Sequence, residues 1–409
     1  MRRNISLTSD AMSEADPKRR HSRAAAPLPL PDQVALVLQG GGALGAFQGG
    51  VYEALHAAAI EVDWVAGISI GAVNAALIAG NPPERRVEAL RAFWDKVTGA
   101  LPDFPIWPSE RMRELVHEWA AGIVMAAGVP GMFAPRLVPP MLAPPGTAQA
   151  LSFYDTAPLR ATLDALVDWD LLNDGPVRLS VGAVELATGN FSYFDTTEVR
   201  IDARHIMASG ALPPGFPPVE IDGKLWWDGG LVSNTPLTHI LANQREDMLV
   251  FQVDLFSAAA PVPRTIMDVF AREKEIRFSS RTRMVTDELL RLRKERERIR
   301  RLVAKLPPEL ADDPDARALA CAAQEHAVNV VHLIYRANGW EGGARDFEFS
   351  ARTRTEHWQA GRAAVAETID RASLIATNIA DGKTAAFDLT KSPLPQAGEA
   401  GARREAVGG

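Results

Sequence analysis

Hydrophobic positions near the beginning of the chain follow a strand–helix–strand–helix order. Val34–Leu38 is a short, uninterrupted apolar run, which is typical of a strand buried on both faces of a parallel sheet. A helix-like pattern follows over Ala46–Ala59, then a second short apolar run at Val62–Ala66 and a second helical stretch at Ala72–Ala79. Two strands that alternate with two helices predict an α/β fold with a mostly parallel sheet.

Further strands are expected in the middle of the chain. Val177–Val184 and Asn190–Phe194 are strand-like runs joined through a Thr-Gly turn, and Met248–Val253 is the last run that indicates a buried strand. The segment Val219–Trp227 has an Asp-Gly dipeptide at its centre, which supplies the positive φ values of a tight turn at low cost. This segment is therefore predicted to form a β-hairpin.

The pattern becomes helical beyond Phe256. Five apolar residues of a highly charged segment fall at helical spacing on one predicted face: Leu289, Leu292, Ile299, Val303 and Leu306. We therefore divide the chain into a main α/β domain over residues 32–256 and a mainly helical extension over residues 257–388. Residues 1–31 and 389–409 are rich in Pro, Gly, Ala or polar residues and are expected to be flexible tails.

One segment inside the main domain has a different composition. Leu101–Ala150 is rich in Pro, Met and Trp and poor in charge, so it is not expected to form one regular element. Two interpretations are open. The segment forms a lid or the wall of an apolar site, or it is an insertion packed against the core.

Composition places the chain among ordinary globular proteins. Of its 409 residues, 47% are hydrophobic and 23% are charged, which excludes wholesale disorder, collagen-like repeats and coiled-coil rods. The net charge of −7 gives no general reason to expect a nucleic-acid partner. The single cysteine, Cys321, excludes an intramolecular disulfide and a metal site of several cysteines, and it is compatible with a reducing, cytoplasmic location.

No segment indicates export or a membrane span. Arg2 and Arg3 resemble the basic start of a signal peptide, but no apolar run of about 7–15 residues follows them. The longest stretches of low charge, Val65–Gly80 and Ala120–Pro135, are shorter than the roughly 20 apolar residues of a spanning helix. Both are therefore expected to be buried core or the wall of a pocket.

A glycine-rich loop follows the first predicted strand. Gly40–Gly45 matches the pattern G-x-G-x-x-G between a strand and a helix. Glycines at these positions allow a sharp turn and leave backbone N–H groups directed outward near the positive end of a helix dipole. Such a loop stabilises negative charge, either on a phosphate or on a developing oxyanion. The phosphate alternative is a dinucleotide site, for which Asp63 has nearly the required spacing.

A second motif follows the second predicted strand. Gly67-Ile68-Ser69-Ile70-Gly71 matches G-x-S-x-G between the strand and the next helix, which is the context of a nucleophile elbow. In such a turn the serine hydroxyl is exposed at a helix N-terminus, and the flanking glycines, Gly67 and Gly71, prevent clashes with neighbouring backbone. Together with the glycine-rich loop as an oxyanion hole, the motif predicts that Ser69 is a catalytic nucleophile.

A serine nucleophile requires a base, and the most suitable candidate is Asp228. It follows Trp226 and Trp227 and precedes Gly229 and Gly230, which allow close approach of other groups. The two Trp side chains are expected to exclude water and to raise the pKa of Asp228. None of the eight histidines lies in a comparable context, and a serine after only two strands does not fit the order of Ser-Asp-His hydrolases.

These motifs, in this order, resemble the patatin-like phospholipases. The resemblance covers the region from Asp32 to Phe256 and rests on the loop Gly40–Gly45, the elbow followed by Ala72-Val73-Asn74-Ala75, the segment Ser209-Gly210-Ala211-Leu212-Pro213, and Asp228-Gly229-Gly230. It implies a patatin-like three-layer α/β fold with a mostly parallel central sheet. Some bacterial members are similar in carrying a C-terminal extension.

The resemblance also implies an activity, that of a lipid acyl hydrolase that uses a Ser-Asp dyad, an acyl-enzyme and no cofactor or metal ion. By position, Ser69 would be the nucleophile and Asp228 the proton acceptor. The residues that would form the oxyanion loop are Gly40, Gly41, Gly42, Ala43 and Gly45. The expected donors within it are the backbone amides of Gly41, Gly42 and Ala43.

One departure from the family pattern is Leu44, where many relatives have a basic residue. If that charge contacts a lipid head group, its absence affects substrate preference more than the chemistry. The expected substrate is a phospholipid, a neutral lipid, a short acyl ester or a storage polyester, and the sequence does not choose among them.

The C-terminal extension contains a basic segment. Arg272 to Lys305 has 13 Lys and Arg against 6 Asp and Glu, a net charge of +7. Two interpretations fit this composition. The segment is a solvated helix packed on the main domain, or it makes peripheral contact with an anionic membrane surface or an acidic partner.

Overall fold

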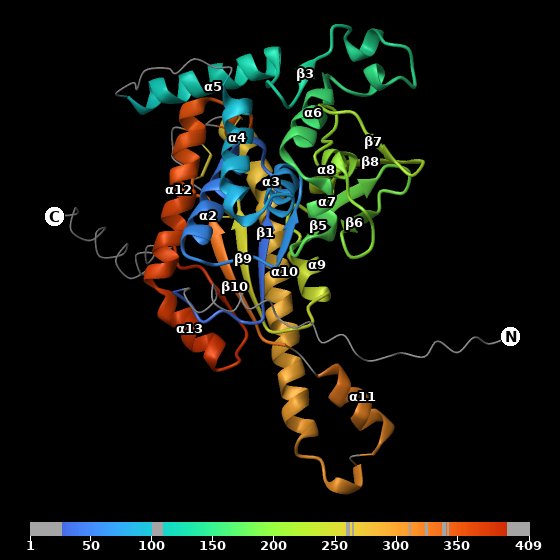
Figure 1. Cartoon of the computed structure of the whole chain (residues 1–409), viewed down its shortest axis with the longest axis vertical. Coiled ribbons are helices and arrows are strands. Elements are labelled where there is room, and N and C mark those ends of the chain that lie inside the picture. The colour runs from blue at the N-terminus through green and yellow to red at the C-terminus, as the bar shows by residue number, and fades with distance from the viewer. Residues whose placement is uncertain are drawn as a thin grey trace, which may run out of the picture.

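The computed structural model of the chain describes residues 27–99, 109–258, 262–263, 266–310, 312–323, 326–337, 341 and 343–390. In these residues a central β-sheet is covered by helices on both faces, which gives three layers (Figure 1). The predicted three-layer α/β architecture is confirmed.

The central sheet has the strand order β11-β10-β9-β1-β2-β5-β8-β7, and β6 also pairs with β5. Its strands are β1 (Gln33–Leu38), β2 (Trp64–Gly67), β5 (Arg178–Glu185), β6 (Phe191–Asp195), β7 (Val219–Ile221), β8 (Lys224–Asp228), β9 (Met248–Asp254), β10 (Val328–Ile334) and β11 (Ala385–Phe387). The pairs from β11 across to β5 are parallel, whereas β5 pairs antiparallel with β6 and β8, and β7 with β8. The sheet is thus mostly parallel, as predicted, and β7 and β8 form the expected hairpin.

Helices connect most of these strands. The α-helices are α2 (Ala46–Ala57), α3 (Ile70–Ala79), α4 (Arg86–Thr98), α5 (Glu110–Ala127), α6 (Ala157–Leu166), α7 (Trp169–Asp174), α8 (Ala203–Ser209), α9 (Leu237–Ala242), α10 (Ile266–Val303), α11 (Pro314–Ala322), α12 (Ala351–Asp370) and α13 (Ala372–Ala380). Short 3-10 turns include η1 (Gly42–Gly45), η3 (Pro140–Leu142), η4 (Ala148–Leu151), η5 (Gly229–Leu231) and η8 (Arg345–Phe347).

Strand β1 lies in the middle of the sheet and is buried on both faces. Val34 and Leu36 belong to the large apolar cluster on the face covered by α2 and α3. Ala35 and Val37 belong to a second cluster on the opposite face, together with Leu237 of α9. Figure 1 shows α2 and α3 in front of the sheet and the long helix α10 behind it. An uninterrupted apolar run is what such a two-sided environment requires.

The two motif-bearing turns connect the expected elements, with shifted boundaries. Strand β2 begins at Trp64 rather than Val62, and α3 begins at Ile70 rather than Ala72. The helix start was misplaced because Gly71, which indicates a break in the sequence, lies inside the first helical turn. A Cβ atom at Gly71 would lie 2.3 Å from the carbonyl oxygen of Leu38, so this glycine serves close packing against β1.

The prediction that Met248–Val253 is the last buried strand is wrong. Strand β10 pairs in parallel with β9 along its whole length, and β11 pairs with β10. The C-terminal extension is mainly helical, as expected, but it also adds these two strands to the sheet. The run Val328–Ile334 is mostly apolar. However, α10 and α11 separate it from β9 in the sequence. Local patterning does not reveal a pairing across such a distance.

The extension packs tightly against the first helix. A Cβ atom at Gly50 of α2 would lie 1.9 Å from the carbonyl oxygen of Trp358 in α12, and one at Gly361 would lie 2.1 Å from that of Phe47. Glycines in both helices therefore let their backbones come close. Trp358 also donates a hydrogen bond from its indole nitrogen to the Glu53 carboxylate on α2.

The second half of α10 extends away from the sheet, with α11 beside it (Figure 1). The single apolar face predicted for this region is not continuous. Ile299 and Val303 are half-buried, but 39% of Leu292 is exposed. Leu306 lies beyond the end of the helix, and the side chain of Leu289 lies outside the described residues.

The segment of unusual composition consists of several elements. Its first residues, 101–108, lie outside the described ranges; the rest contains α5, η3, η4 and β3 (Ala134–Pro135), which pairs with β4 (Tyr154–Asp155). None of the described helices combines the length and the apolar character that crossing a membrane requires. At the two ends of the described chain, Leu28 and Leu389 are buried, so packing begins before Asp32 and continues to Leu389.

Candidate active site

A cavity lies beside the carboxyl ends of β1 and β2, and both sequence motifs reach it. Its empty volume is about 920 Å³, including the open mouth. Ser69, Asp228 and the backbone of Gly40–Gly42 line it. Most of the remaining wall is apolar, with six aromatic rings: Phe133, Phe216, Phe256, Phe278, Phe347 and Phe349. The cavity thus combines a small polar centre with a large hydrophobic wall.

Ser69 occupies a strained turn between β2 and α3. Its φ of 55° and ψ of −123° lie in a region that residues with a side chain rarely adopt. The turn is closed by two glycines, because a Cβ atom at Gly67 would lie 2.3 Å from the carbonyl oxygen of Gly71. The strain therefore has a structural cause. The tight turn places the Ser69 side chain at the start of α3 and in the cavity.

One short segment contacts the backbone of both candidate residues. The Ser209 hydroxyl accepts a hydrogen bond from the Ser69 amide at 3.1 Å and donates one to the Gly182 carbonyl at 2.7 Å. Two residues further on, the Ala211 carbonyl accepts a hydrogen bond from the Asp228 amide at 3.0 Å. The small-residue segment identified from the sequence thus holds the serine turn and the end of β8 in one arrangement.

Asp228 is buried at the end of β8. Its side chain is 2% exposed, and its Oδ1 atom accepts a hydrogen bond from the Gly230 amide at 2.7 Å. Burial raises the pKa of Asp228 to about 7, although hydrogen bonds from Gly230 and the Ser69 side chain favour the charged form. A carboxylate with this pKa exchanges its proton near neutral pH, which suits a general base.

The two Trp residues before Asp228 are not part of the cavity wall. Neither Trp226 nor Trp227 lines the cavity. Trp226 packs instead against Phe194, with ring centroids 4.9 Å apart. The apolar groups around the cavity come from other parts of the chain, including Met207 and Phe216.

The glycine-rich loop is tied to the segment after Asp228 through Asn234. The Asn234 side chain donates a hydrogen bond to the Gly40 carbonyl at 2.9 Å, and the Gly40 amide donates one to the Asn234 carbonyl at 3.3 Å. A Cβ atom at Gly40 would lie 2.4 Å from Asn234 Oδ1 and 3.0 Å from the Ser69 Cβ. Only glycine leaves room for the loop to lie this close to the serine.

Two buried amide side chains hold the remainder of the loop. Gln39 Oε1 accepts hydrogen bonds from the amides of Leu255, at 2.6 Å, and Phe256, at 3.1 Å, after β9. Asn74 of α3 donates a hydrogen bond to the Gly45 carbonyl at 3.0 Å. Gln39, Asn234 and their contacts were not predicted, since single polar residues outside a recognised motif give no local signal.

Gly42 is where the C-terminal extension meets the loop. Its φ is +55°, and a Cβ atom there would lie 2.3 Å from the carbonyl oxygen of Asp346 in η8. The Asp346 carboxylate pairs with Lys274 of α10 at 2.5 Å. Within the described residues, the amides of Gly41, Gly42 and Ala43 donate no hydrogen bond to another backbone group. Gly41 and Gly42 line the cavity together with Ser69, whereas Ala43 does not.

Because of this contact, Gly42→Ala is expected to lower the free energy of unfolding by about 2–4 kcal/mol, from backbone strain and overlap with Asp346. Urea denaturation measures the loss. Gly382→Ala is the matched control, since Gly382 has a φ of +61° and a Cβ atom at this position would have no other atom within 4 Å. That variant should lose only about 1 kcal/mol. Equal losses in the two variants would contradict the close contact.

The dinucleotide alternative loses support because of the position of Asp63. This residue precedes β2, and its carboxylate accepts a hydrogen bond from the Val34 amide at 2.7 Å, near the start of β1. The glycine-rich loop follows the other end of β1. In a dinucleotide-binding fold the acidic residue lies at the carboxyl end of the second strand, on the same side as the loop. Asp63 and the glycine-rich loop are therefore at opposite ends of the strands β1 and β2.

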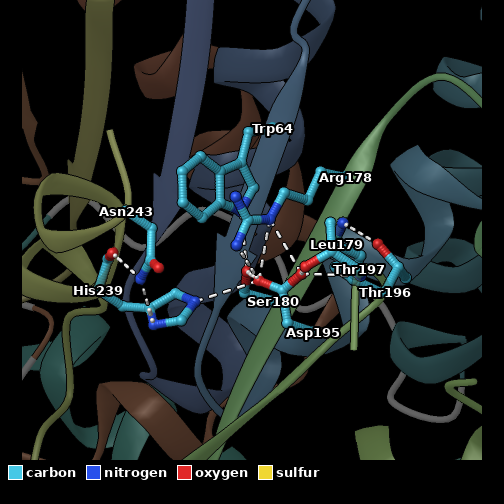
Figure 2. A network of polar contacts seen from close by, with 9 residues as sticks. All are labelled: Trp64, Arg178, Leu179, Ser180, Asp195, Thr196, Thr197, His239 and Asn243. Atoms are coloured by element: carbon cyan, nitrogen blue, oxygen red, sulfur yellow. Dashed lines mark hydrogen bonds and ion pairs between the residues drawn. The ribbon is translucent and has the colours of Figure 1, made fainter. Parts of the chain in front are cut away.

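Figure 2 shows a second set of Ser, Asp and His side chains, none of which lines the cavity. The Ser180 hydroxyl donates to Asp195 Oδ2 at 2.6 Å, and His239 Nε2 lies 3.2 Å from the same oxygen. Burial alone would raise the pKa of Asp195, but hydrogen bonds from His239, Arg178 and Ser180 hold it well below its usual range. The serine thus contacts the carboxylate and not the histidine, unlike a catalytic triad.

This network has a structural explanation. Arg178 begins β5, and Trp64 begins β2, so the network lies at the amino ends of strands whose carboxyl ends face the cavity. The Arg178 guanidinium lies 3.7 Å from the centre of the Trp64 ring. His239 belongs to α9, which the network therefore joins to the sheet. None of the described residues that line the cavity is a histidine, and no group of potential metal ligands occurs among the described residues.

Comparison with known families gives two matches. The family model described as Patatin-like phospholipase matches residues 36–241, and the model DUF3734, described as Patatin phospholipase, matches residues 276–379. The first covers the glycine-rich loop, the serine turn and Asp228. The second covers most of the extension, including η8. No curated protein shows significant similarity to this chain.

Several solved structures match this chain at low sequence identity and with low TM-scores. VipD from Legionella pneumophila is 14% identical, with a TM-score of 0.40 over 92% of this chain and 75% of VipD. Human GIVD cytosolic phospholipase A2 is 12% identical, with a TM-score of 0.38 over 87% of this chain and 63% of the human protein. ExoU from Pseudomonas aeruginosa, in complex with SpcU, is 14% identical. The TM-score is 0.29, over 92% of this chain and 84% of the matched chain.

Proposed function

The chain belongs to the patatin-like phospholipase family, and from this premise we propose that it is a serine acyl hydrolase that cleaves carboxyl esters of lipids. Ser69 is the nucleophile in this proposal, and Asp228 is the proton acceptor. The family supports the coarser assignment of a lipid hydrolase. The finer one rests on the chemistry of the cavity and requires the tests below.

One observation carries the proposal: a strained serine and a buried carboxylate with a raised pKa share one apolar cavity. The Ser69 side chain is close enough to the Asp228 carboxylate to favour its charged form. A serine hydroxyl is a weak nucleophile unless an adjacent base takes its proton. Since no described histidine lines the cavity, Asp228 is the best-placed group for this task.

The reaction would proceed in two stages. Asp228 accepts the proton of Ser69 as Oγ attacks the ester carbonyl, and the alcohol part of the lipid leaves with a proton from Asp228. This step forms an acyl-enzyme on Ser69. Asp228 then takes a proton from a water molecule as that water attacks the acyl group. It returns this proton to Ser69 Oγ as the bond to the acyl group breaks, which releases a fatty acid and restores the serine.

The negative charge of the tetrahedral intermediate requires hydrogen-bond donors. The amides of Gly41 and Gly42 are suitable, because both residues line the cavity together with Ser69 and their N–H groups have no backbone acceptor among the described residues. In comparable sites one such donor contributes about 3–4 kcal/mol to transition-state stabilisation. Asn234 would act as a positioning residue, since it holds Gly40 against the Ser69 side chain.

The lining favours a long acyl chain as the part of the substrate that enters the cavity. Apolar side chains such as Ile70, Leu159, Met207 and Phe216 surround the polar centre. Burying apolar surface contributes about 0.8 kcal/mol for each CH₂ group, so a long chain binds better than a short one. Short acyl esters and polyesters would use less of this wall.

A direct test measures products by mass spectrometry. We expect the protein to release long-chain fatty acids from phospholipid vesicles, and to cleave long-chain esters with a higher kcat/KM than short ones. Triacylglycerol and a storage polyester serve as comparison substrates. A protein that cleaves only short esters or only the polyester would contradict the assignment as a lipid hydrolase of this kind.

The pKa of Asp228 gives a pH prediction. A base must be ionised to act, so kcat/KM is expected to fall about tenfold per pH unit below pH 7, with a midpoint near the pKa of about 7. With an aspartate of ordinary pKa, this fall in kcat/KM would have its midpoint near pH 4. A water-soluble ester is the suitable substrate, and circular dichroism at each pH checks that the fold persists. A constant rate down to pH 5 would exclude Asp228 as the base.

A further inference from the structure

Beside the cavity, the chain exposes a group of large apolar side chains that the proposed reaction does not use. We call this group the apolar rim: Leu137, Val138, Met141, Leu142, Leu151 and Phe153. Leu137 is 101% exposed, Met141 78% and Leu142 76%. Single exposed apolar residues are common on proteins, but a contiguous group of this kind marks an interaction site.

We propose that the apolar rim docks the mouth of the cavity onto the surface of a phospholipid bilayer. The proposal rests on the proposed function, because a lipid acyl hydrolase must reach a substrate that is packed in a membrane. Three features of the described residues support it: the absence of exposed charge on the rim, its attachment to the cavity wall, and its location in the molecule.

The rim has almost no charge. From Gly128 to Phe153 the chain contains one charged residue, Arg136, and no acidic residue. Arg136 is half-buried, and its Nε atom donates a hydrogen bond to the Ser152 hydroxyl at 3.0 Å. A charge is costly to place in the apolar part of a bilayer, whereas Leu and Met side chains are favourable there. The composition thus fits lipid better than a charged protein partner.

The rim is attached directly to the wall of the cavity. The Phe153 amide donates a hydrogen bond to the Pro214 carbonyl at 3.2 Å, and the Tyr154 amide donates one to the Gly215 carbonyl at 2.9 Å. The neighbouring Leu212 lines the cavity and is itself 37% exposed. An acyl chain that leaves a bilayer at the rim would therefore pass onto the apolar cavity wall with little exposure to water.

Helix α5 presents further apolar residues at the same end of the molecule. Met112 and Leu115 are 39% and 52% exposed, and they lie on one face of this helix. Tyr154 links the two elements, since its hydroxyl donates a hydrogen bond to the Met125 carbonyl of α5 at 2.6 Å. In Figure 1, α5 and the segment after β3 lie together at the top.

The basic part of α10 has a different location. Its protruding half and α11 lie at the end of the molecule opposite α5 (Figure 1). A membrane contact through that half would hold the cavity away from the bilayer. The interpretation that the basic segment contacts the membrane is therefore not favoured. We assign the membrane contact to the uncharged apolar rim instead.

The test measures binding to vesicles of ether-linked phosphatidylcholine, which contain no carboxyl ester to cleave. The full chain is mixed with these vesicles and sedimented, and the bound fraction is compared between the wild type and Leu137→Asp/Met141→Asp. Removing two inserted side chains should lower the vesicle partition coefficient by at least about tenfold. Both positions are largely exposed, so thermal unfolding should be unchanged.

The matched control is Leu302→Asp/Leu310→Asp, which introduces the same charges near the opposite end. Leu302 is 63% exposed and Leu310 45%. This variant should bind vesicles like the wild type. Hydrolysis of a water-soluble ester should be equal within about twofold in all three proteins, because neither pair touches the cavity; this readout tests the proposed function separately from docking.

Two results would overturn the docking proposal. The first is a wild type that does not bind the vesicles, and the second is a rim variant that binds as well as the wild type. If the wild type does not bind, light scattering then shows whether the rim variant has a changed oligomeric state. Such a change would identify the apolar rim as a contact between two copies of this chain.

Discussion

Replacing Ser69 with alanine is expected to lower kcat for ester hydrolysis by about 10⁴-fold or more, because the nucleophilic oxygen is removed. The fold should persist, since the change deletes one small hydroxyl group and the Ser69 amide keeps its hydrogen bond to Ser209. The measurement is the rate of release from a soluble long-chain ester, with circular dichroism as the check on folding. A folded variant that retains a tenth of the wild-type rate would exclude Ser69.

The same position offers an internal control through its backbone strain. Ser69 has a φ of +55°, where a Cβ atom is unfavourable. Ser69→Gly should therefore be as inactive as Ser69→Ala and more stable than it by about 1 kcal/mol. This opposite behaviour of activity and stability is expected of a functional turn, in which the chain tolerates strain to place a reactive group.

Replacing Asp228 with asparagine is expected to lower kcat by about 10²–10⁴-fold, since a general base contributes a factor of this size. Asparagine has nearly the same shape and can still accept the hydrogen bond that the Gly230 amide donates. It cannot take the proton of Ser69. The variant is measured with the same soluble ester, and retention of more than about a tenth of the wild-type rate would mean that a different group is the base.

The Asp228→Asn variant should also be more stable than the wild type at pH 8. Burial raises the pKa of Asp228 from 3.8 in the unfolded chain to about 7 in the folded one. Ionisation of the folded form therefore destabilises it increasingly as the pH rises from about 4 to 7, and the full cost of about 4 kcal/mol is present above pH 7. Asparagine carries no such cost.

The pH dependence provides the control for this stability effect. At pH 4 the aspartate is protonated in the folded state, so the two proteins should have nearly the same free energy of unfolding. The difference in favour of Asp228→Asn should grow toward pH 8. Urea denaturation at both pH values measures it. A difference that does not change with pH would contradict a raised pKa at Asp228.

The parts of the fold that position the cavity could be predicted because their signals are local. The apolar runs at β1 and β2 are each followed directly by a glycine motif and a helix, and the predicted boundaries of these elements lie within two residues of the observed ones. The Asp-Gly turn likewise predicted the hairpin of β7 and β8. In each case neighbouring residues specify the conformation.

The rest depends on contacts between distant segments. Strand β10 pairs with β9, but α10 and α11 lie between these two strands in the sequence. Neighbouring residues therefore give no indication of this pairing. The contact of Asp346 with Gly42 likewise joins the extension to the glycine-rich loop.

The supporting residues of the cavity were missed for the same reason. Asn234 and Gln39 are single polar residues whose roles follow from hydrogen bonds across the fold. Ser209 lay in a segment that the sequence did single out, but its contact with the Ser69 amide required the structure. The position of Asn234 shortly after the Asp-Gly-Gly motif was the one available signal, and it was too weak to interpret alone.

The central claim is that Ser69 is an activated nucleophile, and reaction with a long-chain fluorophosphonate tests it most directly. This reagent reacts rapidly with a serine whose proton can be taken by a neighbouring base, and much more slowly with an ordinary serine. Intact mass of the wild type should increase by one adduct, peptide mapping should locate that adduct on Ser69, and Ser69→Ala should remain unmodified. A wild type that stays unmodified while a known serine hydrolase in the same tube is labelled, or an adduct that persists in Ser69→Ala, would contradict the account.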